Sequence, residues 1–162
     1  MSDSAPLRPS LAPYDRHPLQ EVLRRTASRL PGKTAVIDGD RRYTHKQLDE
    51  YSDRFAAGLA GLGVAKGDRV GILAPNCVEF IIAFYGIIKA GAVATTVNSG
   101  YREREITAQL NASGTRLLIV HRSLIEMAEL AARHLVSHGA KTILVANRTH
   151  SSGETLAKDL GG

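Results

Sequence analysis

The sequence predicts an α/β fold built on a mainly parallel β-sheet with helices on both faces. Short runs of aliphatic and β-branched residues alternate with longer segments whose apolar residues recur at helical spacing. Capping residues and glycines mark the ends of these helical segments. Apolar residues make up 43% of the chain, 5% are aromatic and 15 are glycines, a composition typical of a globular α/β protein. The strand order is left open.

The first part of the chain predicts a helix, a hairpin and a second helix. Apolar residues recur at helical spacing over residues 18–30. Residues 33–45 have the pattern of two short strands with Asp38-Gly39 as the tight turn between them. Thr44 and Gln47 are spaced as a capping box, which predicts that a long helix begins there.

From residue 68 onward, strands and helices alternate. Asn76 with Glu79, and Ser123 with Glu126, are spaced as two further capping boxes. Parallel strands joined by crossover helices are covered on both faces, which predicts a three-layer architecture of the Rossmann-like or flavodoxin-like kind. In order, the sequence predicts strand 68–74, helix 76–91, strand 92–97, helix 102–110, strand 116–120, helix 123–138, strand 142–146 and helix 154–160.

A length of 162 residues suits one domain. Residues 1–16 are rich in proline and have few apolar anchors, so we expect a flexible tail there. Residues 17–162 are predicted to form a single α/β domain.

Charge and composition exclude several classes of partner. The net charge is +5, but basic residues are scattered and adjacent only in the pairs Arg24-Arg25 and Arg41-Arg42, with no aromatic residues between them, so no nucleic-acid partner is expected. No apolar run approaches the roughly 18 residues of a membrane span, and no membrane partner is expected. The single cysteine, Cys77, excludes an internal disulfide, and the first residues lack a secretory signal, which predicts a cytoplasmic location.

Residues 41–120 carry motifs that are specific to one enzyme family. They include "GDRVGILAPN" at residues 67–76 and "KAGAV" at residues 89–93, followed by Val97-Asn98. On these motifs, residues 19–122 resemble the start of AMP-forming acyl-CoA synthetases, the adenylate-forming ligase family. The resemblance implies a parent enzyme that couples ATP to a carboxylate, forms an acyl-adenylate and transfers the acyl group to a thiol.

The resemblance does not bring a catalytic site. In that family the phosphate-binding loop is rich in Ser, Thr and Gly and closes with Pro-Lys-Gly, and it comes later, as do the adenine and ribose motifs and the catalytic lysine. The nearest similar stretch here, "ASGTRLL" at residues 112–118, lacks the second glycine and the lysine, so it is predicted to be a helix-to-strand turn. ATP-binding motifs are absent, no catalytic residue is predicted, and the chain alone is not expected to be an enzyme.

A second resemblance covers residues 126–162, where "VANRT" at residues 145–149 is the most distinctive piece. This segment resembles the NADP-binding domain of glutamyl-tRNA reductase. The resemblance implies that Asn147, Arg148 and Thr149 would contact the 2′-phosphate of NADP. An exposed ion pair contributes only about 0–1 kcal/mol, so we expect no bound cofactor and keep NADP binding as an alternative.

The two resemblances together predict a chimera with its junction within residues 117–127. The turn there is His121–Leu124, whose side chains fill the space that glycines leave open in a dinucleotide fold. The expected function is therefore a non-catalytic folded chimeric or truncated domain derived from the start of an acyl-CoA synthetase. The alternatives are a ligase piece completed by another polypeptide, an NADP-binding module and a self-associating fold.

Two further expectations concern association and metals. A sheet taken from larger parents leaves strand edges and apolar faces uncovered, which predicts a homo-oligomer. His134 and His138 are spaced i and i+4 as zinc ligands can be, but no third ligand is evident and basic residues are favoured near helix ends. No metal site is predicted. "GLGVAKG" at residues 61–67 is predicted to be a helix end and a turn.

Overall fold

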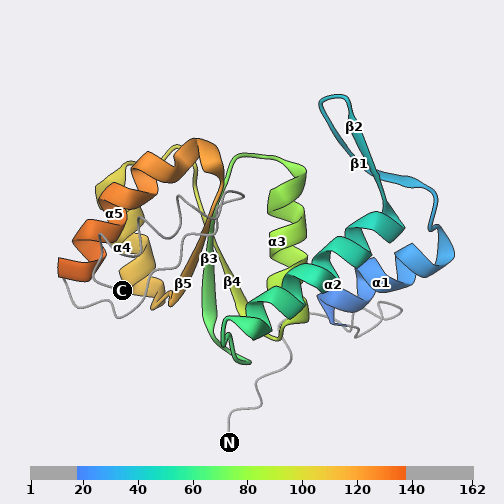
Figure 1. Cartoon of the computed structure of the whole chain (residues 1–162), viewed down its shortest axis with the longest axis horizontal. Helices are drawn as coiled ribbons and strands as arrows, with labels where there is room; N and C mark the ends of the chain where they lie inside the picture. Colours follow the sequence, from blue (N-terminus) through green and yellow to red (C-terminus); the bar gives the residue numbers. More distant parts are fainter. Residues whose placement is uncertain (1–17, 138–162) are drawn as a thin grey trace, which may run out of the picture.

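A computed structural model describes residues 18–137 of the 162-residue chain. Among the helices in this range, none has the length and apolar character needed to cross a membrane. The predicted tail 1–16, strand 142–146 and helix 154–160 lie outside it. In chain order (Figure 1), the elements are α1 (Leu19–Arg29), β1 (Thr34–Asp38), β2 (Arg41–Thr44), α2 (His45–Gly61), β3 (Arg69–Leu73), α3 (Val78–Lys89), β4 (Val93–Val97), α4 (Glu103–Ser113), β5 (Leu117–Val120), the 3₁₀ turn η1 (Arg122–Leu124) and α5 (Ile125–Ser137).

The main sheet has three parallel strands in the order β4-β3-β5. The central strand pairs with both neighbours, so that Val70 lies opposite Ala94 on one side and Leu117 on the other. The prediction of an α/β fold with a parallel sheet is confirmed. The structure also settles the strand order, which the sequence pattern left open.

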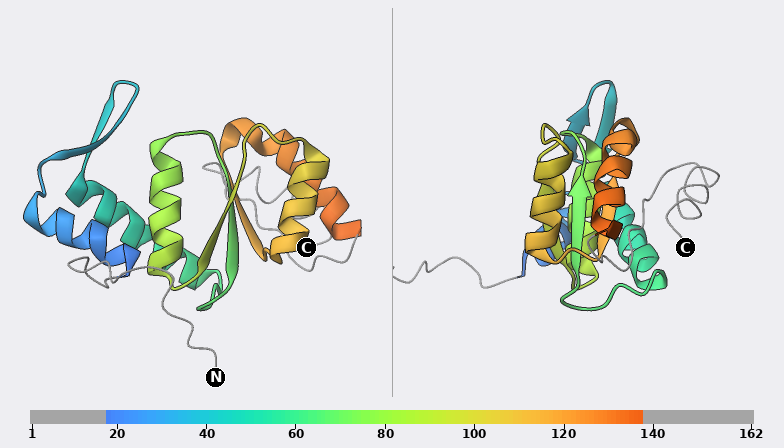
Figure 2. Two further views of the ribbon diagram at one scale, coloured as in Figure 1. Left: turned by 180° about the vertical axis from the view of Figure 1, so that it is seen from behind. Right: turned by 90° about the vertical axis from the view of Figure 1, so that its left-hand side faces the viewer.

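Helices cover both faces of this sheet. In Figure 1 the sheet separates α4 and α5 from α2 and α3, and Figure 2 shows α4 and α5 side by side over one face. Side chains alternate along a strand, so β5 contributes to both apolar layers. Leu118 and Val120 pack with Ile106 of α4 and Ala128 of α5, whereas Leu117 belongs to the layer formed with α2 and α3.

The connections explain where the sheet opens. The helix α3 runs from β3 to β4 over one face, and α4 returns past β3 to β5 over the other face. Right-handed crossovers in opposite directions place their helices on opposite faces. The helix that follows β3 is α3, and the helix that follows β5 is α5, which packs beside α4 on the opposite face. A crevice forms between the carboxyl ends of β3 and β5, where the chain leaves the two strands toward opposite faces.

The N-terminal elements pack against α3. The antiparallel pair β1–β2 leads into α2, and the predicted capping box is confirmed, since Gln47 N–H donates to Thr44 Oγ1 at 3.2 Å and Thr44 N–H donates to Gln47 Oε1 at 2.9 Å. A small apolar core joins α1, α2 and α3 through Leu23, Leu48 and Val78.

A buried ammonium group also joins α3 to α2. Lys89 Nζ lies 2.6 Å from Asp49 Oδ1, 2.8 Å from Asp53 Oδ1 and 2.9 Å from the carbonyl oxygen of Asp49, and its side chain is only 3% exposed. Three acceptors match the three donors of an ammonium group, so the buried charge is fully paired.

The other two predicted capping boxes are wrong. The helix α3 begins after Cys77, whose side chain makes no capping bond, and Val78 N–H donates instead to Asp38 Oδ2 at 3.2 Å, a partner 40 residues away in the chain. Ser123 lies inside η1, and α5 begins at Ile125. At α3 a distant side chain thus replaces the local cap, whereas at α5 the local bonds from Ser123 N–H to His121 Nδ1 and from Leu124 N–H to the His121 carbonyl oxygen form η1 instead of a capping box.

Candidate functional site

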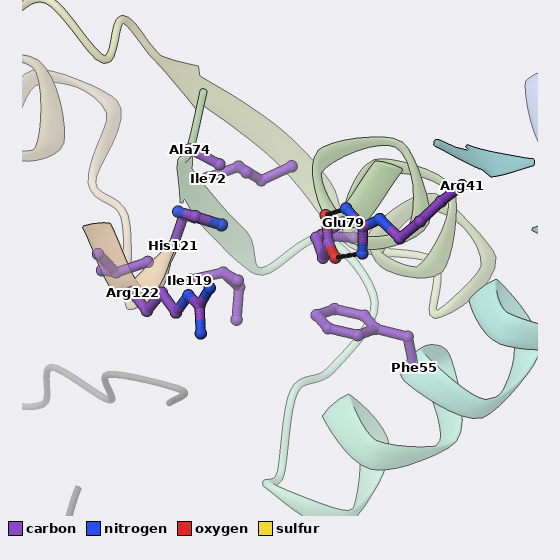
Figure 3. Close-up of a pocket in the computed structure, with 10 residues that line it drawn as sticks. Arg41, Phe55, Ile72, Ala74, Glu79, Ile119, His121 and Arg122 are labelled. Atoms are coloured by element: carbon purple, nitrogen blue, oxygen red, sulfur yellow. Dashed lines mark hydrogen bonds and ion pairs between the residues drawn. The ribbon is translucent and has the colours of Figure 1, made fainter. Parts of the chain in front are cut away.

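A pocket of about 420 Å³ lies at the crevice between the carboxyl ends of β3 and β5 (Figure 3). In open α/β sheets, this edge and this kind of position are where ligands bind. The hairpin, α2, α3, both strands and η1 contribute to its walls, through Arg41, Phe55, Ile72, Ala74, Glu79, Ala83, Ile119, Val120, His121 and Arg122.

The floor of the pocket is apolar. Phe55 of α2 and Ile119 of β5 face it together with Ile72, which is fully buried. Ile119 itself is only partly buried, whereas its neighbours Leu118 and Val120 on the opposite face are 3% and 4% exposed. The carboxyl half of β5 is thus covered by α4 and α5 on one side and open toward the pocket on the other.

One wall carries an ion pair between the hairpin and α3. Arg41 Nη1 donates to Glu79 Oε1 at 2.8 Å, and the same guanidinium also pairs with Asp38 and lies 5.7 Å from the ring centroid of Tyr43. The hydrogen bond from Arg41 holds the pKa of Glu79 below its usual value, and the bond to Glu79 raises the pKa of Arg41. Both groups are therefore charged at neutral pH, and two carboxylates offset the charge of Arg41.

The opposite wall carries His121 and Arg122, which follow β5 directly (Figure 3). His121 Nδ1 lies 2.8 Å from Ser123 Oγ and accepts from Ser123 N–H at 3.3 Å. Because Nδ1 accepts, the neutral ring carries its hydrogen on Nε2. Among residues 18–131, whose side chains the structure describes, Arg122 has no ion-pair or hydrogen-bond partner.

These features define what the pocket can hold. Its apolar floor suits aliphatic or aromatic groups, and the positive rim at Arg122 suits an anionic group beside them. Among the described residues that line the pocket there is no serine, cysteine, threonine or lysine.

The residues predicted to contact NADP are not among the residues that line this pocket. Asn147, Arg148 and Thr149 lie outside the described residues, so the NADP prediction stays untested. His138, half of the possible zinc pair, also lies outside. Within the part of the chain that the structure covers, no cluster of three or more His, Cys, Asp or Glu residues could hold a metal ion.

Two stretches that resemble glycine-rich nucleotide loops are turns, as predicted. The helix α2 ends within residues 61–67, where Gly63 and Gly67 have φ values of 78° and 87°. Within residues 112–118, α4 ends at Gly114, whose φ of 61° is a left-handed helix cap, and the chain enters β5 three residues later. Neither stretch lies between a strand and a following helix, where a phosphate-binding loop belongs.

No local pattern in the sequence marks the pocket. Phe55, Ile72 and Ile119 occupy ordinary core positions of a helix and two strands, and Arg41 belongs to one of two adjacent basic pairs. The one general signal is position, since polar residues that directly follow a parallel strand, such as His121 and Arg122, lie at the binding edge of the sheet.

Comparison with known proteins identifies the family. The model of the family described as AMP-binding enzyme matches residues 23–161. The 4-coumarate–CoA ligase of Pinus taeda is 33% identical over 131 residues, which are 79% of this chain and 24% of that enzyme. The long-chain-fatty-acid–CoA ligase of Salmonella typhimurium is 38% identical over 103 residues, which are 63% of this chain and 18% of that enzyme.

Solved structures of the same kind superpose on this chain. The apo structure of Mycobacterium smegmatis MbtA matches 92% of this chain and 28% of its own, with a TM-score of 0.73 and 34% identity. The anthranilate CoA ligase AuaEII in complex with anthranoyl-AMP matches 87% of this chain and 27% of its own, with a TM-score of 0.73 and 27% identity. The chain thus spans about a quarter or less of the length of the curated relatives it matches.

The comparisons support the ligase resemblance and give no support to a reductase segment. The family match extends past the predicted junction, residues 117–127, and through residues 126–161, which we expected to derive from glutamyl-tRNA reductase. A strand, a helix and a second strand recur in most α/β proteins, so a short resemblance built on that pattern discriminates poorly between families. The chain belongs to the AMP-binding enzyme family.

Proposed function

We propose that this chain is a non-catalytic part of an AMP-forming acid–thiol ligase. In this proposal it supplies the first folded α/β body, and the chemical groups for acyl-adenylate and thioester formation come from the rest of such an enzyme. The observation that carries the proposal is the family match over residues 23–161 in a chain that covers only 24% and 18% of two curated ligases.

The chemistry of adenylation supports this. Activation of ATP needs a cradle of free backbone N–H groups and a cation around the phosphates. The 162 residues contain no Ser-, Thr- and Gly-rich loop that closes with Pro-Lys-Gly, and the two glycine-containing stretches that resemble one are turns. The pocket between β3 and β5 has a positive rim, and none of the described residues that line it is a glycine.

The proposal is tested by pyrophosphate release. The purified chain is incubated at high concentration with ATP, Mg²⁺ and either a long-chain fatty acid or an aromatic acid, and a full-length acid–CoA ligase serves as the positive control. We expect release no higher than in the matching reaction without acid. Acid-dependent release by the chain alone would show that it is a complete catalyst and would refute the proposal.

A second arm of the assay addresses completion by another polypeptide. The part of the Pinus taeda 4-coumarate–CoA ligase that this chain does not match is added as a separate protein. Activity in the mixture but in neither protein alone would show that the chain contributes to a split enzyme. That outcome agrees with a non-catalytic part that folds independently.

A further inference from the structure

Asp38 and Gly39 form the only Asp-Gly pair in the sequence, and every other aspartate is followed by a residue with a side chain. The pair lies where β1 ends, because Asp38 is paired with Arg41 across the turn of the hairpin. Gly39 has a φ of 59° and Asp40 has no positive φ, which is the pattern of a type II′ turn with glycine first. The turn therefore favours glycine directly after Asp38.

An Asp-Gly pair is chemically reactive because glycine has no side chain to hinder its own amide nitrogen. That nitrogen attacks Cγ of the aspartate, its proton and the hydroxyl group of the carboxylic acid leave as water, and a five-membered succinimide ring closes. Water then opens the ring at one of its two carbonyl carbons. Opening at Cγ restores aspartate, whereas opening at the main-chain carbonyl carbon gives isoaspartate. Water is lost once and regained once, so the product is an isomer and no other reactant is needed.

In the folded chain the carboxylate of Asp38 is held by two contacts. Its Oδ2 atom accepts from Val78 N–H at 3.2 Å, at the start of α3, and pairs with the guanidinium of Arg41. Arg41 is held in turn by Glu79, since Arg41 Nη1 lies 2.8 Å from Glu79 Oε1. Ring closure turns the carboxyl group toward the nitrogen of Gly39, so it competes with both contacts of Oδ2. The loss of either contact therefore removes part of the protection.

We propose that Asp38 is a site of spontaneous isomerisation to isoaspartate, held in check by Arg41 and by the start of α3. Isoaspartate carries the main chain through Cβ and Cγ, which adds an atom next to a turn whose strands are in fixed register. The carboxylate that remains is attached directly to Cα. It no longer reaches Val78 N–H as the Asp38 side chain does, so the modification releases the hairpin from α3. The inference concerns how the chain ages and is independent of the proposed function.

Peptide mapping tests the proposal. The purified 162-residue chain is incubated at neutral pH below its thermal midpoint and then digested. Isoaspartate is detected in peptides of unchanged mass and altered retention that accept a methyl group from an isoaspartyl methyltransferase. A synthetic peptide of residues 33–45, which contains the same Asp-Gly pair, gives the unprotected rate. We expect isoaspartate at residue 38, formed more slowly in the folded chain than in the peptide.

Two results would overturn the proposal. If the chain contains no isoaspartate at residue 38 when the peptide has reached its equilibrium mixture, the folded chain is not modified there. If the chain and the peptide react at equal rates, the contacts of Asp38 give no protection. Asp38→Glu is the chemical control, because glutamate would have to close a six-membered ring. Isomerised product that persists in this variant would show that it does not arise at Asp38.

Two matched variants test the role of Arg41. Arg41→Ala removes one contact of Oδ2, whereas Arg42→Ala, on the same strand, leaves both in place. We expect Arg41→Ala to raise the rate about threefold and Arg42→Ala to leave it within about 1.5-fold, because an exposed ion pair contributes modestly. Circular dichroism confirms that both variants fold. Glu79→Gln keeps Arg41 but weakens its hold, so an intermediate rate is expected. Equal rates in the two arginine variants would refute protection by Arg41.

The isomerised chain also tests the structural consequence. It is separated from the unmodified chain by chromatography, and its thermal unfolding is compared with that of the unmodified chain. We expect a lower midpoint for the isomerised chain, because the cap that Asp38 provides for α3 is lost. Equal midpoints would show that the hairpin stays attached to α3 and would refute the proposed release.

Discussion

Two ion-pair clusters hold the N-terminal elements to the two ends of α3, and they differ in burial. At the carboxyl end, the Lys89 side chain is 3% exposed and contacts Asp49 and Asp53 of α2. At the amino end, the Arg41 side chain is 51% exposed and joins the hairpin to Glu79. The Lys89 ion pairs are thus buried in the contact between α2 and α3, whereas the Arg41–Glu79 ion pair borders an open pocket.

Solvent explains the difference. Charges attract more strongly where water is excluded, but a buried charge that loses its partner is costly. Exposed pairs contribute little because water and salt screen them. We therefore expect stability to depend on the Lys89 end, and the Arg41 end to tolerate change. Substitutions at each end of α3, and at the helix contact between the ends, test this contrast.

Replacement of Lys89 tests the buried end. Lys89→Ala removes the buried cation that both Asp49 and Asp53 contact, and only Asp53 keeps another partner, the exposed Arg24 at 3.4 Å. We expect a loss of about 2–3 kcal/mol in the free energy of unfolding. Urea unfolding followed by circular dichroism measures it. The control is Lys46→Ala, which removes a 65% exposed lysine that pairs with Glu50 at 3.8 Å. Similar losses in both variants would show that burial does not separate the two ends.

The middle of the α2–α3 contact is tested with glycines. A Cβ atom at Gly86 would lie 2.7 Å from Cδ1 and 2.9 Å from Cβ of Phe55, and overpacking of this kind costs about 1–3 kcal/mol. Gly58 lies inside α2 with open space around it, so Gly58→Ala is expected to stabilise the chain by up to about 1 kcal/mol. Opposite signs in thermal unfolding are the expected result. Equal shifts would mean that the two helices do not approach closely at Gly86.

Asp38 tests whether the exposed end contributes through its helix cap or through its ion pair. Asp38→Ala removes the acceptor for Val78 N–H at the start of α3, which costs about 1 kcal/mol. Arg41→Ala keeps that cap and removes only the exposed cation. We expect a smaller change in the unfolding midpoint for Arg41→Ala than for Asp38→Ala. The reverse order would assign the stabilising role to the ion pair.

The pH dependence of stability is the smallest effect. The hydrogen bond from Arg41 lowers the pKa of Glu79 from its ordinary value of 4.5, so the contribution of Glu79 is fully present above about pH 4.5 and is lost as pH falls through the folded-state pKa. We expect the difference in thermal midpoint between the wild-type chain and Glu79→Gln to shrink as pH is lowered below that value. A difference that grows toward acid pH would contradict the paired geometry.

Local patterns predicted much of the fold. The capping box at Thr44 and Gln47, the hairpin turn at Asp38-Gly39 and the turns at Gly63 and Gly114 all depend on residues close together in the sequence, and the structure has each of them. The capping-box pattern did not predict the start of α3, because the group that accepts from Val78 N–H is Asp38, which is far away in the sequence. The reductase resemblance found no support in the comparisons, and a strand, a helix and a strand follow one another in many unrelated α/β proteins.

The fold class, the ends of several helices and the family could all be predicted from the sequence, because periodicity, caps and family motifs are properties of short stretches of chain. Tertiary structure decided the strand order β4-β3-β5, the pairing of Lys89 with α2, the cap that Asp38 provides for α3 and the pocket at Ile119 and Arg122. Each of these joins residues far apart in the chain, and hydrophobic periodicity is the same whichever strand becomes a neighbour.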